Sequence, residues 1–352
     1  MKKLLSVLLA LVIFVGCAAP SFAAAYGDED EAESLCAEFF DGMGPEVNGF
    51  ALDYAAFSPV KDDADTQKYP LVVWLHGMGG GACKRSQLEG NGFYYWARED
   101  FQSRFPQGGA YLLAPRSPED KNLFWTNELI EPLMAAIADF AAQNENVDTT
   151  RIYLGGYSMG GKMTIRTAIT YPNVFAAIFP ICPASDFGGE ALSYIKDIPM
   201  WLTVSTRDIL AGWYTYSRGI WDSYCGQTSL KDDSRLSLLG KVCYPDGKKT
   251  SSNHHAWYAV TYDMFAENGG DYYNMTTYGA DGREIKLEYP DGMISWLSAH
   301  TSDYAGGVPE VSGGWPLTER QSDWFIHSIR PMAKALLSVI SEVIFGSIGC
   351  RD

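Results

Sequence analysis

The chain has 352 residues, of which 47% are hydrophobic and 14% aromatic, enough apolar side chain for one large core. It carries 27 basic and 43 acidic residues, a formal net charge of −16. This charge argues against partners that are themselves anionic, such as nucleic acids and acidic membrane surfaces. We expect a folded acidic protein without stable membrane insertion. The composition leaves its oligomeric state open.

Residues 1–23 have the organisation of a secretory signal peptide. Two lysines precede an apolar stretch, and a run of small residues allows cleavage after Ala23. The alternative is a lipoprotein signal, in which Cys17 carries the lipid. In both cases we expect the protein to be secreted or otherwise extracytoplasmic. The acidic segment that follows, residues 24–47, is interpreted as a solvated, mobile leader.

Six cysteines remain once the predicted signal peptide is removed, and an even number in an exported chain suggests disulfide bonds. We favour a bond between Cys225 and Cys243, because a loop this short closes most easily. The sequence has no Cys-x-x-Cys pair and no cluster of histidine and cysteine, so we predict neither a metal site nor a cofactor. The six are Cys36, Cys83, Cys182, Cys225, Cys243 and Cys350.

Hydrophobic runs alternate with helical patterns through the first two thirds of the chain. Residues 50–60 alternate as a half-exposed strand would, and five continuous apolar runs are typical of strands buried on both faces. Residues 127–144 and 162–172 have helical spacing. This order predicts an α/β fold with a mostly parallel central sheet, right-handed crossovers and helices on both faces. The five runs are 69–77, 110–115, 151–156, 176–181 and 200–205.

The pattern loosens after residue 210. Residues 211–253 and 265–292 are rich in glycine, tyrosine and aspartate, and we expect long loops there that shape a binding site. The folded catalytic domain is expected to cover residues 48–310. Residues 311–352 predict a helical extension that packs on the domain, because charged residues interrupt their apolar run.

Glycines surround Ser158 at the end of a predicted strand, in the sequence GYSMGG (156–161). The strand must turn sharply into a helix that begins near Lys162, and the residues two positions from the serine must lack side chains to fit. Such a turn exposes the hydroxyl above the sheet, at a helix N-terminus that favours a developing anion. We therefore predict that Ser158 is a nucleophile.

A serine nucleophile needs a general base, and a carboxylate must orient that base. Of the five histidines, His254 and His255 lie on a late loop, where this type of sheet carries the base. The loop position by itself leaves both open. Asp208 follows the last of the buried strands and is the favoured acid. Asp186 and Asp222 are the alternative acids.

The attack also requires two backbone N–H groups that bind the oxyanion. Met159, directly after the serine, supplies one of them. The other is expected in the glycine-rich loop LHGMGGG (75–81), from Met78 or its neighbour Gly77. A phosphate-binding loop does not fit these residues, because the lysine and the serine or threonine that would close it are missing.

The motifs LHGMGGG, GGYSMGG, STRD and HHAW, in this order, resemble those of the secreted α/β-hydrolase esterases. The most similar group is the polyhydroxybutyrate depolymerase-like and feruloyl or acetyl-xylan esterase-like branch, which borders on the prolyl-oligopeptidase-type hydrolases. The resemblance covers about residues 48 to 300 and implies the α/β-hydrolase fold, with long loops over the C-terminal edge of its sheet. The chain departs from the family in two places. Aromatic residues follow Asp208, and no clear final strand precedes the histidine pair.

The resemblance also assigns roles to residues. The family's serine, acid and histidine correspond to Ser158, Asp208 and His254. Its H-x-x-W pattern, which ends here at Trp257, selects His254, with His255 as the alternative base. One tryptophan matches a family residue near the substrate cleft, and residues of the two glycine-rich motifs complete the set. The predicted substrate-binding residues are Trp125, Tyr157 and Gly77.

These patterns predict a secreted serine carboxylic-ester hydrolase that acts on acyl groups of plant polysaccharides or polyesters through an acyl-enzyme intermediate. One alternative is a serine peptidase of the prolyl-oligopeptidase type. Another is a carbohydrate- or surface-binding protein that kept the fold without catalysis, in which aromatic side chains stack on sugars. The aromatic residues considered for stacking are Trp213, Tyr214, Tyr216, Trp221, Tyr272 and Tyr273.

Overall fold

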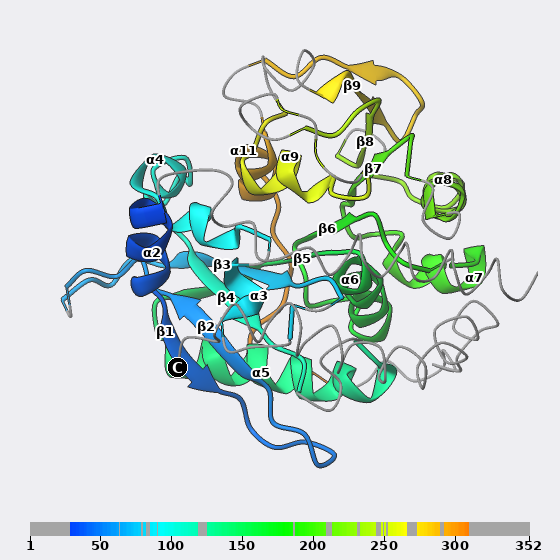
Figure 1. The fold of residues 1–352 in the computed structure, drawn as a ribbon. Coiled ribbons are helices and arrows are strands. Elements are labelled where there is room, and N and C mark those ends of the chain that lie inside the picture. The colour runs from blue at the N-terminus through cyan, green and yellow to red at the C-terminus, as the bar shows by residue number, and fades with distance from the viewer. Residues whose placement is uncertain are drawn as a thin grey trace, which may run out of the picture.

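The computed structural model describes residues 29–309, except for residues 63, 79, 82–84, 90, 119–124, 186, 209–212, 231–232, 244–247, 249, 251–252, 266–272 and 289–291. Within these residues, ten strands form a single sheet (Figure 1). The strands are β1 (Phe40–Met43), β2 (Asp53–Phe57), β3 (Tyr69–Leu75), β4 (Tyr111–Pro115), β5 (Val147–Tyr157), β6 (Ala177–Ile181), β7 (Trp201–Ser205), β8 (Arg235–Leu239), β9 (Met275–Gly279) and β10 (Glu284–Ile285).

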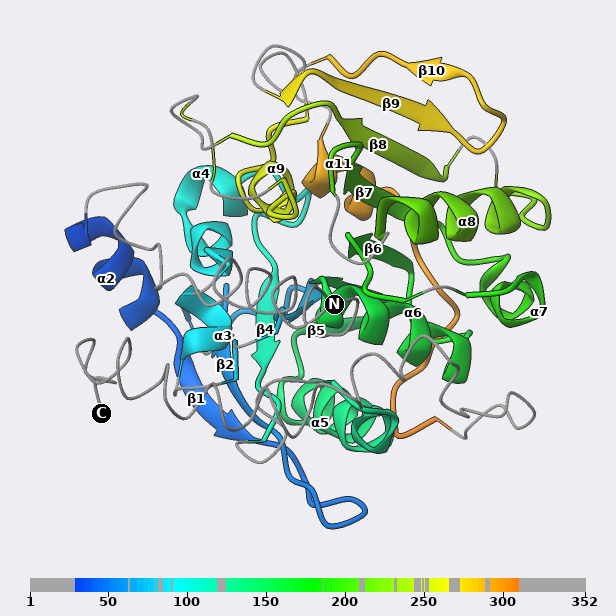
Figure 2. The same cartoon turned by 45° about the vertical axis from the view of Figure 1, so that its right-hand side comes forward.

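The sheet is parallel at its centre and antiparallel at both edges. Its strand order is β1-β2-β4-β3-β5-β6-β7-β8-β9-β10. The strands from β4 to β8 pair in parallel, whereas β1, β2, β9 and β10 join by antiparallel pairing. Figure 2 shows β8, β9 and β10 side by side at one end. Parallel strands end at the same edge of a sheet, so the segments after β3, β5, β6 and β7 meet there.

Helices cover both faces of the sheet, as the sequence predicts. Neighbouring residues of a strand face opposite sides. A Cβ on Gly155 would touch the ring of Phe179, which stacks on Trp96, whereas a Cβ on Gly156 would touch the start of α6. Helices α5 and α6 therefore lie on one side of the central strands, and α9 and α11 lie on the other (Figure 1). The α-helices are α2 (Glu29–Ala37), α3 (Ser86–Glu89), α4 (Glu99–Gln102), α5 (Ile130–Gln143), α6 (Met159–Thr170), α7 (Gly189–Leu192), α8 (Trp213–Cys225), α9 (Trp257–Thr261) and α11 (Met293–Ser298), and the 3-10 helices are η2 (Phe93–Ala97), η4 (Asn127–Leu129) and η5 (Ser193–Ile195).

From residue 29 on, the acidic segment expected to be a mobile leader is instead folded onto the domain. Helix α2 contacts η2, and Arg98 forms an ion pair with Glu31 at 3.2 Å. Strand β1 then pairs with β2. Between the acidic residues, four apolar side chains follow the helical spacing i, i+3, i+4, i+7 and form one buried face. This spacing could have predicted the helix from the sequence. These buried residues are Ala32, Leu35, Cys36 and Phe39.

The chain after residue 210 is more regular than the sequence predicts. Helix α8 and strand β8 occupy much of the first expected loop, and the β9–β10 pair lies in the second. Strand β8 pairs in parallel with β7 and is the final strand that sequence analysis did not find. Its apolar pattern is interrupted by Ser237, which is buried and bonded to Trp201 Nε1 at 2.9 Å and Thr277 Oγ1 at 2.8 Å. The strand was missed in the sequence because it contains this polar residue, which is tolerated in the core because its hydroxyl is hydrogen-bonded.

Two further predictions can be compared with the structure. Cys225 and Cys243 are both described, and no disulfide bond joins them, so the favoured pairing is not formed. Within the described part of the chain, no helix combines the length and hydropathy that crossing a membrane requires. Other predictions fall outside the described residues: the signal peptide at 1–23, Cys17, Cys83, Asp186, Cys350 and the extension at 311–352.

The turn between β5 and α6 has no room for side chains. Ser158 occupies it with φ 58° and ψ −112°. A Cβ built on Gly160 would lie 2.0 Å from the carbonyl oxygen of Leu75, and one on Gly161 would lie 2.8 Å from that of Ile181. Both obstacles are backbone atoms of neighbouring strands and cannot rotate away. The glycines therefore let the first turn of α6 pack directly against β3 and β6.

Replacing Gly160 by alanine should destabilise the protein. The added methyl group would collide with the backbone of β3 and force α6 away from the sheet. We expect the free energy of unfolding to fall by about 1–3 kcal/mol, as for other overpacked sites. Urea denaturation at neutral pH measures this change.

Gly219→Ala is the matched control. A Cβ at this position in α8 would meet nothing within 4 Å. We expect it to raise stability by up to about 1 kcal/mol, since alanine has the higher helix propensity. Equal stability changes in the two variants would contradict the close approach at Gly160.

Candidate active site

Ser158 lies in the strained turn that the sequence predicts. A positive φ is uncommon for a residue other than glycine and has to be held by its surroundings. Ser158 N donates to Ile181 O at 2.8 Å, while Ser158 O accepts from the amides of Lys162 at 3.0 Å and Ala184 at 3.1 Å. The residue is only 3% exposed, so surrounding segments enclose the serine that we expected to stand above the sheet.

Asp208 and His254 are in direct contact. Nδ1 of His254 lies 2.6 Å from Oδ2 of Asp208, and the two side chains are 1% and 0% exposed. A carboxylate can only accept, so Nδ1 carries the proton and donates it to Asp208. This tautomer leaves Nε2 as the basic nitrogen of the imidazole. The two residues come from the segment after β7 and the segment before α9, as the sequence predicts.

This pair lies beside the serine turn. The ring of Tyr157, the residue before Ser158, is 4.9 Å from the His254 ring between centroids. On the β6 side, Ser158 N is bonded to Ile181, and the next residue is Cys182. The Cys182 sulfur lies within 4.8 Å of the ligand atoms of both Asp208 and His254. The ends of β5, β6 and β7 therefore converge on one imidazole.

The alternative base and acid occupy other surroundings. The His255 ring has its centroid 6.4 Å from that of Tyr157 and 6.4 Å from that of Trp257. Burial, with a smaller effect from neighbouring His254, lowers the pKa of His255 to about 4. Asp222 lies in α8, where it pairs with exposed Arg218 at 3.1 Å. The geometry therefore favours His254 and Asp208 over these two.

Cys182 is a neighbour of the pair that sequence analysis did not single out. It is fully buried, with φ 42°, and its amide donates to Thr203 O at 2.9 Å. Burial and the Asp208 charge raise the pKa of its thiol, which keeps the sulfur protonated. Only the approach of β6 to β7 in three dimensions brings it here, so no sequence spacing could reveal it.

Cys182, Asp208 and His254 offer three atoms of the kinds that bind metal ions. The 2.6 Å separation between Nδ1 and Oδ2 is that of a strong hydrogen bond. Two ligands about 2 Å from one zinc ion at tetrahedral angles would stand roughly 3 Å apart. The protonated thiol is also a poor ligand. The observed arrangement therefore fits a hydrogen-bonded pair better than a metal site.

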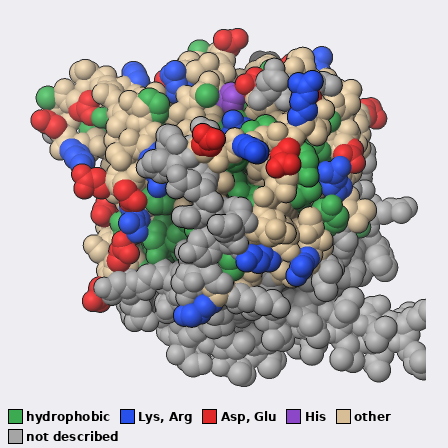
Figure 3. Space-filling view, turned by 90° about the horizontal axis from the view of Figure 1, so that it is seen from above, with side chains coloured by type: hydrophobic (Ala, Val, Ile, Leu, Met, Phe, Trp, Pro, Cys, Tyr) green, Lys and Arg blue, Asp and Glu red, His purple; other side chains and the backbone are tan. Residues whose placement is uncertain are grey.

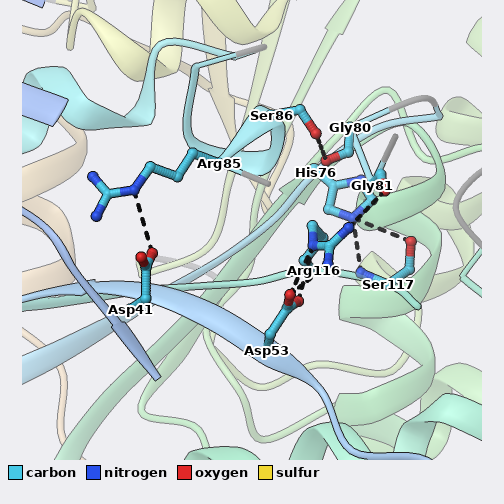
Figure 4. Close-up of polar contacts among 9 residues, drawn as sticks. All are labelled: Asp41, Asp53, His76, Gly80, Gly81, Arg85, Ser86, Arg116 and Ser117. Carbon is cyan, nitrogen blue, oxygen red and sulfur yellow. Dashed lines mark hydrogen bonds and ion pairs between the residues drawn. The ribbon is translucent and has the colours of Figure 1, made fainter. Parts of the chain in front are cut away.

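The loop after β3 is held by the buried imidazole of His76. The Ser117 amide donates to Nε2 of His76 at 3.2 Å, so that nitrogen must be an acceptor. Nδ1 then carries the proton and donates to Gly77 O at 2.6 Å, and Figure 4 shows the contact of His76 with Ser117. Burial lowers the pKa of His76 to about 4, and the charge of Arg116 adds to this effect. The imidazole is therefore a neutral brace of the loop.

The predicted oxyanion donors lie on the two sides of the serine. Met159 is the first residue of α6, where backbone N–H groups have no acceptor within the helix. On the loop, the Gly77 amide is directed to Asn91 Oδ1 at 3.4 Å. This contact leaves the amide of Met78 as the candidate donor from the loop. The sequence had left Met78 and Gly77 open.

The predicted substrate-binding residues turn out to support the site. Trp125 is 1% exposed, and its indole N–H donates to His76 O at 2.9 Å. Tyr157 is 7% exposed, and a Cβ on Gly77 would lie 2.7 Å from its ring. Both side chains pack beneath the loop and the imidazole, and their expected contact with the substrate stays a prediction. A buried tryptophan and a cleft tryptophan look alike in sequence.

Charges of both signs are mixed over the face seen from above (Figure 3). Hydrophobic side chains show between them, and one histidine reaches the surface. In the described part of this face, the basic side chains do not gather into one continuous patch.

Stability should fall as the pH is lowered from about 6.5 to about 4. The folded chain keeps His76 neutral, whereas in the unfolded chain this residue binds a proton near pH 6.5. Between these values the unfolded state binds more protons, so His76 alone should cost the folded state about 3 kcal/mol by pH 4.

Urea denaturation between pH 7.5 and 4.5 tests this expectation. In His76→Asn, whose amide N–H can still donate to Gly77 O, the decline should be smaller than in the wild type. His255→Asn should behave in the same way, because its pKa is lowered to a similar value. Parallel stability curves for wild type and variants would show that these histidines are not held neutral.

A family model and curated relatives match parts of the chain. The model of the prolyl oligopeptidase family matches residues 125–218, which include Ser158 and Asp208. A bifunctional acetylxylan esterase/xylanase, XynS20E from Neocallimastix patriciarum, is 23% identical over 192 residues, 53% of this chain and 26% of that protein. Feruloyl esterase B from Neurospora crassa is 29% identical over 119 residues, 31% of this chain and 37% of that protein. The chain thus spans well under half the length of these relatives.

Among solved structures, the crystal structure of a thermostable esterase is 26% identical to the chain, with a TM-score of 0.55. The match covers 66% of this chain and 62% of that one. This chain's own sheet, parallel at its centre with helices on both faces, is described above. The chain has the α/β-hydrolase fold, and its resemblance to esterases of that fold, predicted from the sequence, is confirmed.

Proposed function

We propose that this protein is a serine carboxylic-ester hydrolase that works through an acyl-enzyme intermediate. The observation that carries the proposal is the 2.6 Å contact between His254 and Asp208, beside a serine held at φ 58° at the start of a helix. A nucleophile on a strained turn, a base with one protonated nitrogen and a buried carboxylate are the components that acyl transfer needs. The esterase relatives support the same chemistry.

Each group has one step to perform. Nε2 of His254 takes the proton of Ser158 as Oγ attacks the carbonyl carbon of the ester. The tetrahedral intermediate collapses, the carbon–oxygen bond to the alcohol breaks, and the imidazolium returns the proton to the leaving alcohol. Water then attacks the acyl-serine with the same base, which releases the acid and restores the hydroxyl. Asp208 keeps the imidazole oriented and stabilises its positive charge.

The negative charge on the carbonyl oxygen is assigned to the amides of Met78 and Met159. The second of these belongs to the first turn of α6, where the helix dipole also favours an anion. Removing one such donor typically costs about 3 kcal/mol of transition-state stabilisation. The closely packed glycines keep this turn against β3, the strand that leads into the loop of Met78, which supports the assignment.

The substrates we propose are acyl groups esterified to plant polysaccharides. Relatives named as acetylxylan and feruloyl esterases support this class. Such polymers are met outside the cell, which agrees with the export proposed from residues 1–23.

A serine peptidase is the second candidate, favoured by the family model over residues 125–218. It would use the same acyl-enzyme chemistry on an amide. A binding protein without catalysis is less well supported, because two of the aromatic residues considered for sugar stacking are buried. Trp221 is 4% exposed and Tyr273 is 0% exposed.

Ser158→Ala should abolish ester hydrolysis. Loss of the nucleophile is expected to lower kcat by about 10⁶-fold, and Asp208→Asn by about 10⁴-fold. The assay uses p-nitrophenyl acetate, methyl ferulate and acetylated xylan, with p-nitroanilide peptides to detect a peptidase. Asp222→Asn is the matched control for the acid and should retain activity. Hydrolysis that survives in Ser158→Ala would refute the mechanism.

The two adjacent histidines can be separated by the same assay. His254→Ala should lose kcat by about 10⁶-fold, because no base remains to take the serine proton. His255→Ala removes a ring that packs among aromatic side chains, so kcat should change less than tenfold. The opposite ranking of the two variants would transfer the role of base to His255.

A further inference from the structure

An ion pair lies at the edge of the candidate active site without a role in the proposed chemistry. Arg116, directly after β4, faces Asp53 at the start of β2. Its Nε lies 2.9 Å from Oδ1 and 3.0 Å from Oδ2 of Asp53, and Nη2 also donates to Oδ2. The Arg116 amide donates to Asp53 O at 2.8 Å. The side chains are 12% and 25% exposed, so the pair is partly shielded from water.

The same guanidinium reaches the loop after β3. Nη1 of Arg116 donates to the carbonyl of Gly81 at 3.2 Å (Figure 4). The next residue, Ser117, presents its amide to Nε2 of His76, and His76 in turn binds Gly77 O. Arg116 and its neighbour therefore hold the loop at two points, one on each side of Met78.

An arginine suits this position better than a lysine. The planar guanidinium offers several N–H groups in a fixed fork, so it can grip a carboxylate and still donate to a third acceptor. The second salt bridge near the loop, between Arg85 and Asp41 at 3.3 Å, is more exposed and anchors a later part of the chain (Figure 4). Partly exposed ion pairs add little to stability. The Asp53–Arg116 pair therefore matters less for stability than for the position of the Gly81 carbonyl, which Arg116 holds.

We propose that Arg116 and Asp53 are positioning residues for the oxyanion donor of Met78, an inference that rests on the proposed esterase function. Asp53 fixes the guanidinium, and the guanidinium fixes the far end of the loop. The near end is fixed by His76. A displacement of about 1 Å in a catalytic group can cost 10²-fold in rate. The effect falls on the transition state, because the oxyanion forms only there.

Arg116→Gln tests the inference by removing the fork and its charge while keeping one amide donor. With p-nitrophenyl acetate, we expect kcat to fall by about 10- to 100-fold, with KM within about twofold of the wild type. The affinity for a trifluoromethyl ketone, which forms the tetrahedral oxyanion, should fall by a similar factor. Asp53→Asn should have the same effect, and the double variant should be no worse than either single variant. Arg116→Lys should recover part of kcat, because it keeps the charge without the fork.

The control is Arg151→Gln, which breaks the Arg151–Asp148 pair. This pair lies near the start of β5, whereas Ser158 follows the end of that strand. Arg151 and Asp148 are 30% and 16% exposed, against 12% and 25% for Arg116 and Asp53, so both pairs are partly shielded from water. It should leave kcat and inhibitor affinity unchanged. A lower Tm in Arg116→Gln with unaltered kcat would overturn the inference, since the pair would then be structural only. A rise in KM at constant kcat would overturn it as well.

Ser158→Ala in the same assay separates this inference from the proposed function. If Ser158→Ala is inactive and Arg116→Gln keeps the wild-type kcat, only the positioning role is wrong. If Ser158→Ala retains activity, the proposed function fails and the positioning role fails with it.

Discussion

The first turn of α6 touches the backbones of β3 and β6, and the candidate site depends on this contact. Two strands from different parts of the chain can approach the turn because Gly160 and Gly161 present no side chains. The approach fixes Ser158 in a conformation that an isolated peptide would avoid. It also determines where the helix N-terminus points, and so where negative charge is stabilised.

Two histidines near this turn have different hydrogen-bond partners and different roles. His76 is neutral and works as a brace, with both nitrogens engaged by the loop and by Ser117. His254 is oriented by a carboxylate, which prepares it to receive a proton. The difference comes from the partners: backbone groups surround one ring, and a buried acid faces the other. At the same edge of the sheet, the imidazole of His76 thus supports the loop, and that of His254 is proposed to transfer a proton.

Much of this arrangement could be predicted from the sequence, because local signals carry it. The apolar runs gave the central strands, and the glycines around Ser158 predicted the turn. Their order along the chain placed Asp208 after a buried strand and the histidine pair on a late loop. The contacts that sequence could not reveal join distant segments. Cys182 meets Asp208 only through sheet pairing, Ser237 hid a core strand, and the charges of α2 concealed its apolar face. The sequence could not show whether Trp125 lines the substrate cleft or packs in the core, because tryptophan is favoured in both places.

The hydrogen bonds that hold Ser158 have a consequence for the order of assembly. Its amide is bonded to Ile181 at the end of β6, and its carbonyl accepts from Ala184. Neither partner is local to the turn, so β5 and α6 by themselves supply only the bond from Lys162 N to Ser158 O. The serine acquires its shape only when β6 docks on β5. A nascent chain therefore cannot hold this turn until residue 184, just past the middle of its 352 residues, has been synthesised. The proposed nucleophile can then take its shape before β7 to β10 have joined the sheet.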